Sequence, residues 1–556
     1  MGVAQDICKR LSELSVQRQS FERIWRQVRR VAAPETRDID FGLGGSISGV
    51  VNDPIGARTS KGIYDTTAVN AVDRLASGIE ALIIPQSEKW HGLGVVDLTR
   101  DELEDSEKLW LERQANLLFK VRYDADSGWV PAAQTAIRRC IAFGAGFIWT
   151  EEGDGKALIR YRGLPTFECY VAENHYGVLD TFYRYYTLTA RQAVQKFKDR
   201  CSAEVKAAAS SSSDMDRPFR FVHAVQPRAD YGNWSRGVKN AEWASMHVEY
   251  ESKTLVGESG FFEFPVVDFR WLPESGCPWG EGPVMKCLAD IQSLNQMAKN
   301  EMLAGQQAVD PPLLVANAGV MNRPNTNPGA VNFGGLSMSG QKMIEPLFTG
   351  QRLDFATMVL EAKRNQVKDS MYLNLFALLV QNPQMSATEA LIRANEKGEL
   401  LGPAGSRLQQ SLSRMIDREM GILIRKGLYD QGSAFQVPRS LQGRDTMAQM
   451  TSVLDRMRRT KEAEGTLRLL EAASPLAQID PTVLDAMDPD ETIRGLAGIF
   501  GVPQQFLRDK KAVAQLRQQR AEQQAAAQNI AAASEMAKAS AQGSQALVNS
   551  RDAGLF

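Results

Sequence analysis

Apolar side chains recur at helical spacing in two long stretches near the middle of the chain. In residues 283–307 the apolar positions are Val284, Leu288, Ile291, Leu294, Ala298 and Met302. In residues 351–372 they are Leu353, Ala356, Leu360, Val367 and Met371. Steps of three and four place such residues on one face of a helix and leave the opposite face polar. The pattern predicts two helices of roughly 37 and 33 Å, each packed on one side and exposed to water on the other.

The N-terminal half changes from helical period to alternation at Gly144. Amphipathic helices are predicted over residues 1–32 (with basic residues opposite the apolar side), 64–84, 101–123 and 129–143. Beyond a tight turn at Gly144, alternation indicates strands. Two hairpins are expected, within 147–162 and between 166–170 and 178–188, and further strands over 219–227, 243–251 and 261–271. Thr189 is expected to cap a short helix, and the small polar residues of 207–216 predict a loop.

The C-terminal half is predicted to be helical. A long pattern covers residues 387–426, with a break expected at Gly402–Pro403 because proline removes a backbone donor. Shorter helices are expected over 445–508. Residues 509–556 are dominated by Ala, Gln and Ser, which leaves open a polar helix packed against other copies or a disordered tail.

Composition and charge exclude several classes of protein. The formal net charge of −1 excludes a strongly basic coat for tight nucleic-acid binding. No apolar run approaches the length of a membrane span, and the charged N-terminal residues indicate no signal peptide, so a soluble cytoplasmic product is expected. The cysteines have no metal-binding spacing and are expected to be reduced thiols: Cys8, Cys140, Cys169, Cys201, Cys277 and Cys287.

Motifs for catalysis are missing from the sequence. There is no phosphate-binding GxxxxGK[ST] loop, no HExxH and no GxSxG elbow. The histidines lie in unrelated contexts and are interpreted as surface or packed residues: His91, His175, His223 and His247. The acids Asp101, Glu102, Glu104 and Asp105 are better explained as a solvated helix start than as a carboxylate site. No enzyme, cofactor or metal site is predicted.

The second long helix gives a weak nucleic-acid signal. Its cations Lys363, Arg364 and Lys368 are offset by Glu361 and Asp369, with Glu361 and Arg364 spaced as an i,i+3 pair. In a single copy this is an ordinary exposed helix face. Repeated around a ring, however, the same residues would form a belt of charge.

Four stretches of the chain resemble the head-to-tail connecting (portal) proteins of short-tailed, podovirus-type tailed bacteriophages. They run from Tyr64 to Leu93 (YDTTAVNAVDRLASGIEALIIPQSEKWHGL), from Gly280 to Gly319, from Asn382 to Leu408, and more weakly from Ile499 to Gln524. Their order is the one expected of that family. The resemblance implies an α+β, predominantly helical portal fold that assembles as a ring around a central channel.

The resemblance also assigns regions to the chain. The implied regions are a wing (1–279), a stem helix (280–308), a clip (309–350), a second stem helix (351–374), a tunnel loop (375–387), a long wing helix and connection (388–444), a crown (445–508) and a C-terminal helix or tail (509–556). The two long helices of the opening pattern thus become stem helices. The run of residues 375–380, too short for a membrane, becomes part of a loop facing DNA.

Candidate functional residues follow from these regions. The DNA channel would be lined by Lys363, Arg364 and Lys368. The tunnel loop would contribute Leu375, Leu378, Val380, Asn382, Gln384 and Met385. Clip docking would use Pro311, Pro312, Arg323 and Phe333.

The resemblance implies partners as well. They are further copies in a twelve-fold ring, the terminase large subunit, tail adaptor and tail proteins, major capsid and scaffold proteins, and duplex DNA, with no membrane and no cofactor. The location would be a capsid vertex of the virion, and the bacterial host cytoplasm during assembly. The alternatives are an internal scaffold or adaptor without a DNA channel, and a hydrolase or nuclease acting at the DNA end.

Overall fold

The structure is a computed structural model of the 556-residue chain. It describes residues 2–35, 62–99, 102–228, 241–315, 325, 331, 336–337, 339–347, 353–373, 387–430, 432–433, 435–451, 463, 465–473, 475, 488–499, 502 and 506–552. Side chains of residues 353–354, 387–401 and 541–552 are not part of this description.

The chain separates into two compact units, each of which is considered by itself. The first comprises Met1–Gly92, Asn116–Gln436 and Met447–Arg458. The second comprises Leu93–Ala115, Val437–Thr446 and Arg459–Phe556. The three-stranded and five-stranded sheets both belong to the first unit.

Helix α4 (Trp129–Phe143) is the centre of the helical part of the first unit. It packs on the three-stranded sheet and also contacts α1 (Val3–Val31) and α2 (Thr67–Ile83). Trp25 of α1 donates a hydrogen bond from Nε1 to the carbonyl of Phe143 at 2.9 Å. Gly144 then ends α4 at φ 81°, and a Cβ there would lie 1.8 Å from the Gly280 carbonyl oxygen. The predicted tight turn is confirmed, because only glycine fits this approach.

The three-stranded sheet has the order β3-β2-β9 and is antiparallel throughout. Its strands are β2 (Ala145–Glu152), β3 (Ile159–Leu164) and β9 (Val266–Arg270). The first six residues of β2 are all buried. The predicted hairpin within 147–162 is confirmed.

The five-stranded sheet is also antiparallel, with the order β4-β5-β6-β7-β8. Its strands are β4 (Cys169–Glu173), β5 (Leu179–Thr189), β6 (Pro218–Pro227), β7 (Trp243–Glu249) and β8 (Thr254–Phe261). Tyr183 and Val222 pack in a cluster with α1, whereas Tyr186 and Phe221 pack in a cluster with α5 (Ala190–Phe197) and α6 (Ala203–Ser210). Neighbouring residues of a strand point to opposite faces, so helices cover both sides of this sheet.

Local interactions explain several of these elements. Thr189 and Gln192 form a complete capping box at the start of α5, which confirms the predicted cap. Residues 207–216 were predicted as a loop, but α6 reaches Ser210 because Val205 and Ala208 are buried against α5 and the sheet. The strand predicted over 261–271 is wrong in its bounds, since β8 ends at Phe261 and β9 begins at Val266.

The predicted basic outer side of α1 is wrong at two positions. Arg18 is fully buried and Arg29 is 6% exposed. Arg18 donates to the carbonyls of Phe167 and Cys169 at 2.8 and 2.6 Å and is paired with Glu22. The Phe167 and Cys169 carbonyls lie far from α1 in sequence, so helical periodicity alone had no means to indicate them.

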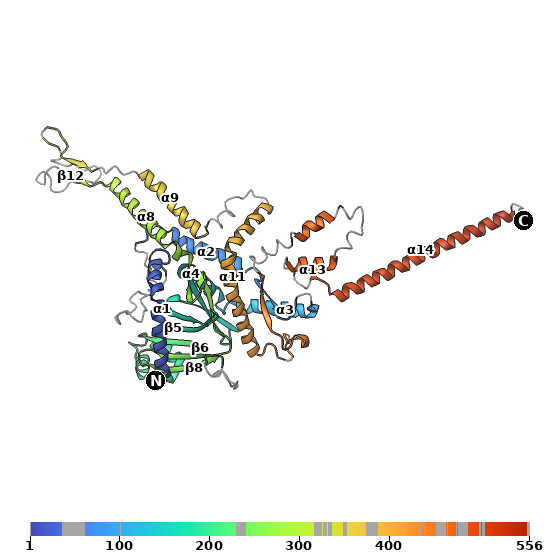
Figure 1. Ribbon diagram of the computed structural model, residues 1–556, viewed down its shortest axis with the longest axis horizontal. Coiled ribbons are helices and arrows are strands. Elements are labelled where there is room, and N and C mark those ends of the chain that lie inside the picture. Colours follow the sequence, from blue (N-terminus) through green and yellow to red (C-terminus); the bar gives the residue numbers. More distant parts are fainter. Residues whose placement is uncertain are drawn as a thin grey trace. The chain divides into compact units, whose positions relative to one another are not determined.

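Two further helices of the first unit lie side by side (Figure 1): α8 (Leu288–Val309) and α9 (Leu353–Ser370). The helix predicted from residue 283 is divided, because α7 (Pro283–Lys286) ends at Cys287 before α8 begins. Tyr372, at φ 57°, follows the end of α9. Between α8 and α9, β12 (Leu313–Val315) pairs antiparallel with β13 (Ile344–Pro346). The sequence pattern of residues 309–350 predicted no strands.

Helix α11 (Ala387–Arg425) confirms the long helical prediction but not its break. The helix continues through Pro403, and the Ser406 hydroxyl donates to the Gly402 carbonyl at 2.9 Å. Downstream of the proline, Leu408, Leu412 and Ile416 are buried. Their packing stabilises the helix despite the lost backbone hydrogen bond. Helix α11 packs against strand β9 of the three-stranded sheet.

The second unit contains the C-terminal helices. Its described elements include the first half of α3 (Asp105–Arg122), α13 (Pro489–Ile499) and α14 (Lys510–Asp552). Arg517 of α14 forms two hydrogen bonds with Asp490, at 2.6 and 2.7 Å. Side chains of residues 517–540 are exposed, so α14 is a single polar helix within this unit. Strands β1 (His91–Val95) and β14 (Thr446–Met450) span the points where the chain passes between the units.

Candidate functional site

Helices α8 and α9 pack through an apolar seam near the body of the first unit. The buried apolar side chains in this region are Leu288, Ile291, Leu294 and Ala298 of α8, Leu360 and Val367 of α9, and Met371 just after α9. Toward the other end of the pair the apolar side chains are exposed, with Met302 at 47%, Phe355 at 62% and Met358 at 72%. Met302 was predicted on the packed stripe and is instead open to solvent in the single chain.

Two of the three predicted channel cations are paired within the chain. Lys363 Nζ lies 2.6 Å from Asp290 Oδ1 of α8, and Arg364 Nε lies 2.8 Å from Asp65 Oδ2. Arg364 also pairs with Glu361, which confirms the predicted i,i+3 pair. Burial of Asp65 disfavours its charge, but hydrogen bonds from Thr67 and Arg364 outweigh this and lower the pKa of the carboxyl.

Asn295 attaches the segment before α2 to α8. Its side-chain oxygen accepts from the backbone nitrogens of Tyr64 and Asp65 at 2.7 and 3.3 Å, and its amide donates to the Gly62 carbonyl at 2.8 Å. One amide side chain therefore satisfies three backbone groups. Together, the Asn295 side chain and the Arg364–Asp65 pair connect α8 and α9 to the segment that precedes α2.

Lys368 has a weaker internal contact than the other two cations. It is half-buried, and its Nζ lies 3.4 Å from Asn365 Oδ1, one turn earlier in α9. No ion pair of Lys368 is present among the described residues. Of the three candidates, Lys368 therefore has the charge most available to another molecule.

The structure places only part of the other candidate residues. Pro311 is half-buried and Pro312 exposed at the base of the β12–β13 hairpin, where the Leu347 nitrogen donates to the Pro312 carbonyl at 2.8 Å. Arg323 and Phe333 lie outside the described residues. The same holds for the tunnel-loop candidates Leu375, Leu378, Val380, Asn382, Gln384 and Met385.

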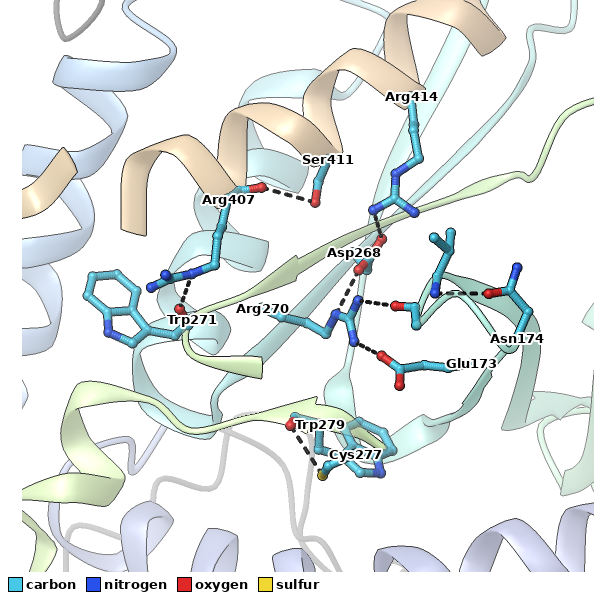
Figure 2. A network of polar contacts seen from close by, with 12 residues as sticks. Glu173, Asn174, Asp268, Arg270, Trp271, Cys277, Trp279, Arg407, Ser411 and Arg414 are labelled. Carbon is cyan, nitrogen blue, oxygen red and sulfur yellow. Dashed lines mark hydrogen bonds and ion pairs between the residues drawn. The ribbon is translucent and has the colours of Figure 1, made fainter. Parts of the chain in front are cut away.

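A row of arginines fixes α11 to the three-stranded sheet. Arg407 Nε donates to the Trp271 carbonyl at 2.9 Å, and Arg414 pairs with the buried Asp268 at 3.0 Å (Figure 2). Farther along, Arg418 donates to the Thr150 carbonyl at 3.0 Å. Arg425 ends the row in a bidentate pair with Glu263, at 2.6 and 2.9 Å. The sequence interpretation missed this row, although spacings of seven, four and seven place these arginines near one face.

A buried ion pair joins α11 to the end of α3. The guanidinium of Arg122 pairs with Glu419, and both side chains are fully buried. Tyr161 donates to the same carboxylate at 2.6 Å, and the Trp90 ring lies 4.4 Å from the guanidinium carbon of Arg122. Burial, together with the positive charge of Arg122, holds the pKa of His91 well below its usual value. Neutral His91 then accepts from Arg122 at 3.3 Å.

The described residues give no sign of a metal site, a reactive thiol or a membrane span. Among the residues that the structure describes, no group of three or more His, Cys, Asp or Glu is arranged to hold a metal ion. Burial raises the pKa values of the Cys140 and Cys169 thiols, which keeps them protonated. The described helices include none with the length and hydropathy of a membrane span.

The chain is similar in sequence to portal proteins of two phages. A probable portal protein of Bordetella phage BPP-1 is 28% identical over 490 residues, covering 86% of this chain and 85% of that protein. A portal protein of Salmonella phage epsilon15 is 27% identical over 558 residues, covering 97% and 94%. A solved chain from the virion of a native gene transfer agent particle aligns over 67% of this chain and 88% of its own, at 11% identity. Its TM-score of 0.32 supports no inference about the fold.

The family model of the bacteriophage head to tail connecting protein matches residues 4–507. That match includes both sheets, the paired helices α8 and α9, and the arginine row of α11. It also confirms the family that the sequence motifs predicted. The chain therefore belongs to the bacteriophage head to tail connecting protein family.

Proposed function

We propose that copies of this portal protein close into a twelve-fold ring around a channel at one capsid vertex, through which duplex DNA enters during packaging and leaves during ejection. The single observation that carries the ring is the set of exposed apolar side chains on the α8–α9 pair. These side chains are Met302, Leu303, Phe355, Met358 and Val359. Grouped exposed apolar side chains mark interaction surfaces, and a head-to-tail ring covers such a surface in every copy.

The regions of the chain then take the following roles in the proposal. Residues 280–308 and 351–374 form the stem, 309–350 the clip, 375–387 the tunnel loop, 1–279 and 388–444 the wing, 445–508 the crown, and 509–556 a C-terminal helix. The hairpin β12–β13 at the end of the α8–α9 pair supports a docking role for the clip. In this role Pro311, Pro312, Arg323 and Phe333 would meet tail adaptors.

The charge of the stem suits sliding rather than holding of DNA. Every phosphate neutralised by a fixed cation adds salt-dependent affinity, so a strongly basic channel would retain the duplex. Lys363 and Arg364 are compensated by Asp290 and Asp65, which leaves Lys368 as a modest positive belt in the ring. The net charge of −1 agrees with this arrangement.

The proposal assigns the motor chemistry to a partner. The sequence has no phosphate-binding loop, so hydrolysis of nucleotide would belong to the terminase large subunit docked on the ring. Tail adaptors, the major capsid protein and scaffold proteins complete the set of partners. Assembly would take place in the cytoplasm of the bacterial host, and the finished ring would remain in the virion.

Electron microscopy of the purified protein tests the ring. We expect annular particles with a central channel for the unmodified chain, and mostly single subunits for the double variant Phe355→Ser and Met358→Ser. Val16→Ser, which changes an apolar residue of α1 that is 66% exposed, is the matched control and should still form rings. If no rings appear under any condition, an internal scaffold or adaptor becomes the better interpretation, for which the exposed helix α14 is suited.

A further inference from the structure

A polar pocket lies between α11 and the end of the three-stranded sheet, apart from the α8–α9 pair. Its cavity measures about 280 Å³. Opposite the helix, β9 contributes Asp268 and Arg270, β4 contributes Glu173, and Glu274 follows β9. Helix α11 contributes Arg407 and Arg414. Figure 2 shows Arg407 and Arg414 approaching from the helix while Arg270 and Asp268 project from the strand.

The charges of this pocket are only partly satisfied within the chain. Arg270 is fully engaged, with Asp268, Glu173 and the Gly177 carbonyl. Arg407 uses only Nε, toward the Trp271 carbonyl, and its two terminal nitrogens have no hydrogen-bond partner among the described residues. The Glu274 carboxylate likewise has none in the described part of the chain. The pocket thus offers one fixed, unpaired guanidinium and one unpaired carboxylate.

The balance of charges indicates which kind of molecule fits. Three arginines face Glu173, Asp268 and Glu274, so the lining is neutral overall. A nucleic-acid backbone carries many phosphates, and these would meet the three carboxylates as well as the one unpaired arginine, which opposes its binding. A single carboxylate side chain instead matches the fork of Arg407, since guanidinium and carboxylate groups form parallel hydrogen bonds.

The rim of the pocket has the composition of a protein interface. Tyr176 is 79% exposed and Val178 is 40% exposed, on either side of the lining residue Gly177. Leu272, beside the lining residue Pro273, is 38% exposed. Tyrosine and arginine are, with tryptophan, enriched at the energetically important contact points between proteins.

We infer that this pocket receives an acidic side chain from a second copy of the chain, which pairs with Arg407 while Tyr176 packs against the surface around it. The inference rests on the proposed ring, because in a closed ring each copy presents the same surface to an identical neighbour. A cavity of about 280 Å³ holds one or two side chains rather than a folded partner. The neighbour need only insert a short loop or helix end.

The test compares the assembly of four forms of the full-length chain. Arg407→Glu reverses the unpaired charge, Tyr176→Ser removes the rim aromatic, and Arg191→Glu makes the same charge change on an exposed residue of α5. Native mass spectrometry against subunit concentration measures the ring fraction. We expect Arg407→Glu and Tyr176→Ser each to raise the half-assembly concentration about tenfold or more, and Arg191→Glu to leave it unchanged.

Circular dichroism checks that each variant is folded. Tyr176 lies at an exposed hairpin tip, so Tyr176→Ser provides a folded variant even if Arg407→Glu does not fold. Rings of unmodified protein that form equally well with either substitution would overturn the inference and leave the proposed function intact. Absence of rings from the unmodified chain would overturn both. The two failures are therefore distinguishable.

Discussion

The Arg122 guanidinium lies against the Trp90 ring and is paired with Glu419, both charges being fully buried. Removing one member of such a pair leaves the other charge without compensation in a poorly solvated site. We expect Glu419→Gln to lower the free energy of unfolding by about 3–5 kcal/mol. Urea unfolding followed by tryptophan fluorescence measures the loss.

A double variant measures how strongly Arg122 and Glu419 interact with each other. Arg122→Met combined with Glu419→Gln removes both charges, so its cost should be well below the sum of the two single changes. A cost equal to that sum would show that the two side chains contribute independently, and the buried pair would then have no special role.

We expect two stacked histidines to make the stability of the first unit depend on pH. His223 and His247 face each other across β6 and β7, with ring centroids 3.8 Å apart. Burial, with the nearby cations Lys196 and Arg184, lowers the pKa of His247 to about 3 and that of His223 well below its usual value. The unfolded chain binds these protons near pH 6.5, so their contribution is complete above that pH.

Stability should therefore fall as pH decreases from about 6.5 toward 3, by up to about 1.4 kcal/mol per pH unit for each histidine. Urea midpoints at pH 7.5, 6 and 5 measure this slope. His247→Gln should flatten it, whereas His175→Gln, at an exposed hairpin tip, should not. An unchanged slope in His247→Gln would exclude this pair as its source.

At the scale of elements, the contact between α4 and β2 depends on a missing side chain. A Cβ on Gly146 would lie 1.9 Å from the Ala136 carbonyl oxygen of α4. Gly146→Ala must push the helix away from the sheet, and we expect a loss of about 2–3 kcal/mol in unfolding free energy. Gly305→Ala in α8 is the control, because open space surrounds that glycine and alanine favours a helix by about 1 kcal/mol. Equal thermal stability of both variants would contradict this role of Gly146.

The sequence was sufficient for elements whose packing is local. The helix predicted over residues 129–143 has the bounds of α4, and Thr189 caps α5 as predicted. The sequence was not sufficient where the burial of a residue depends on partners that are distant along the chain. Arg18 appeared to be a surface residue because its acceptors, the carbonyls of Phe167 and Cys169, come from another part of the chain. The same cause hid the arginine row of α11, whose acceptors lie in the three-stranded sheet or in the segments next to β9.

The candidate site was predictable in its elements but not in its contacts. Helical periodicity and the family motifs indicated the α8–α9 pair, and the structure confirms both helices. Neither signal shows that Lys363 and Arg364 are neutralised by Asp290 and Asp65, residues about 70 and 300 positions earlier. Sequence spacing detects pairs within one helix, such as Glu361 with Arg364, and misses pairs between elements.

For the whole molecule, the internal pairing of Lys363 and Arg364 determines which substitution can test the proposed channel lining. Substituting Lys363 or Arg364 removes a bond between helices as well as a charge, so a defect in either variant has two explanations. Lys368 has only the contact to Asn365 at 3.4 Å. Its substitution therefore tests the proposed channel lining with the least disturbance of the subunit.

We expect Lys368→Ala to assemble into rings normally and to retain packaged DNA less well. In a ring the change removes one charge from every copy, and each lost phosphate contact lowers the dependence of binding on salt by roughly 0.9 in logarithmic slope. Retention is measured as nuclease-protected DNA in assembled particles across a series of salt concentrations. Lys206→Ala, an exposed lysine of α6, is the matched control. If Lys368→Ala rings package and retain DNA as well as those of the control at every salt concentration, Lys368 does not line the channel.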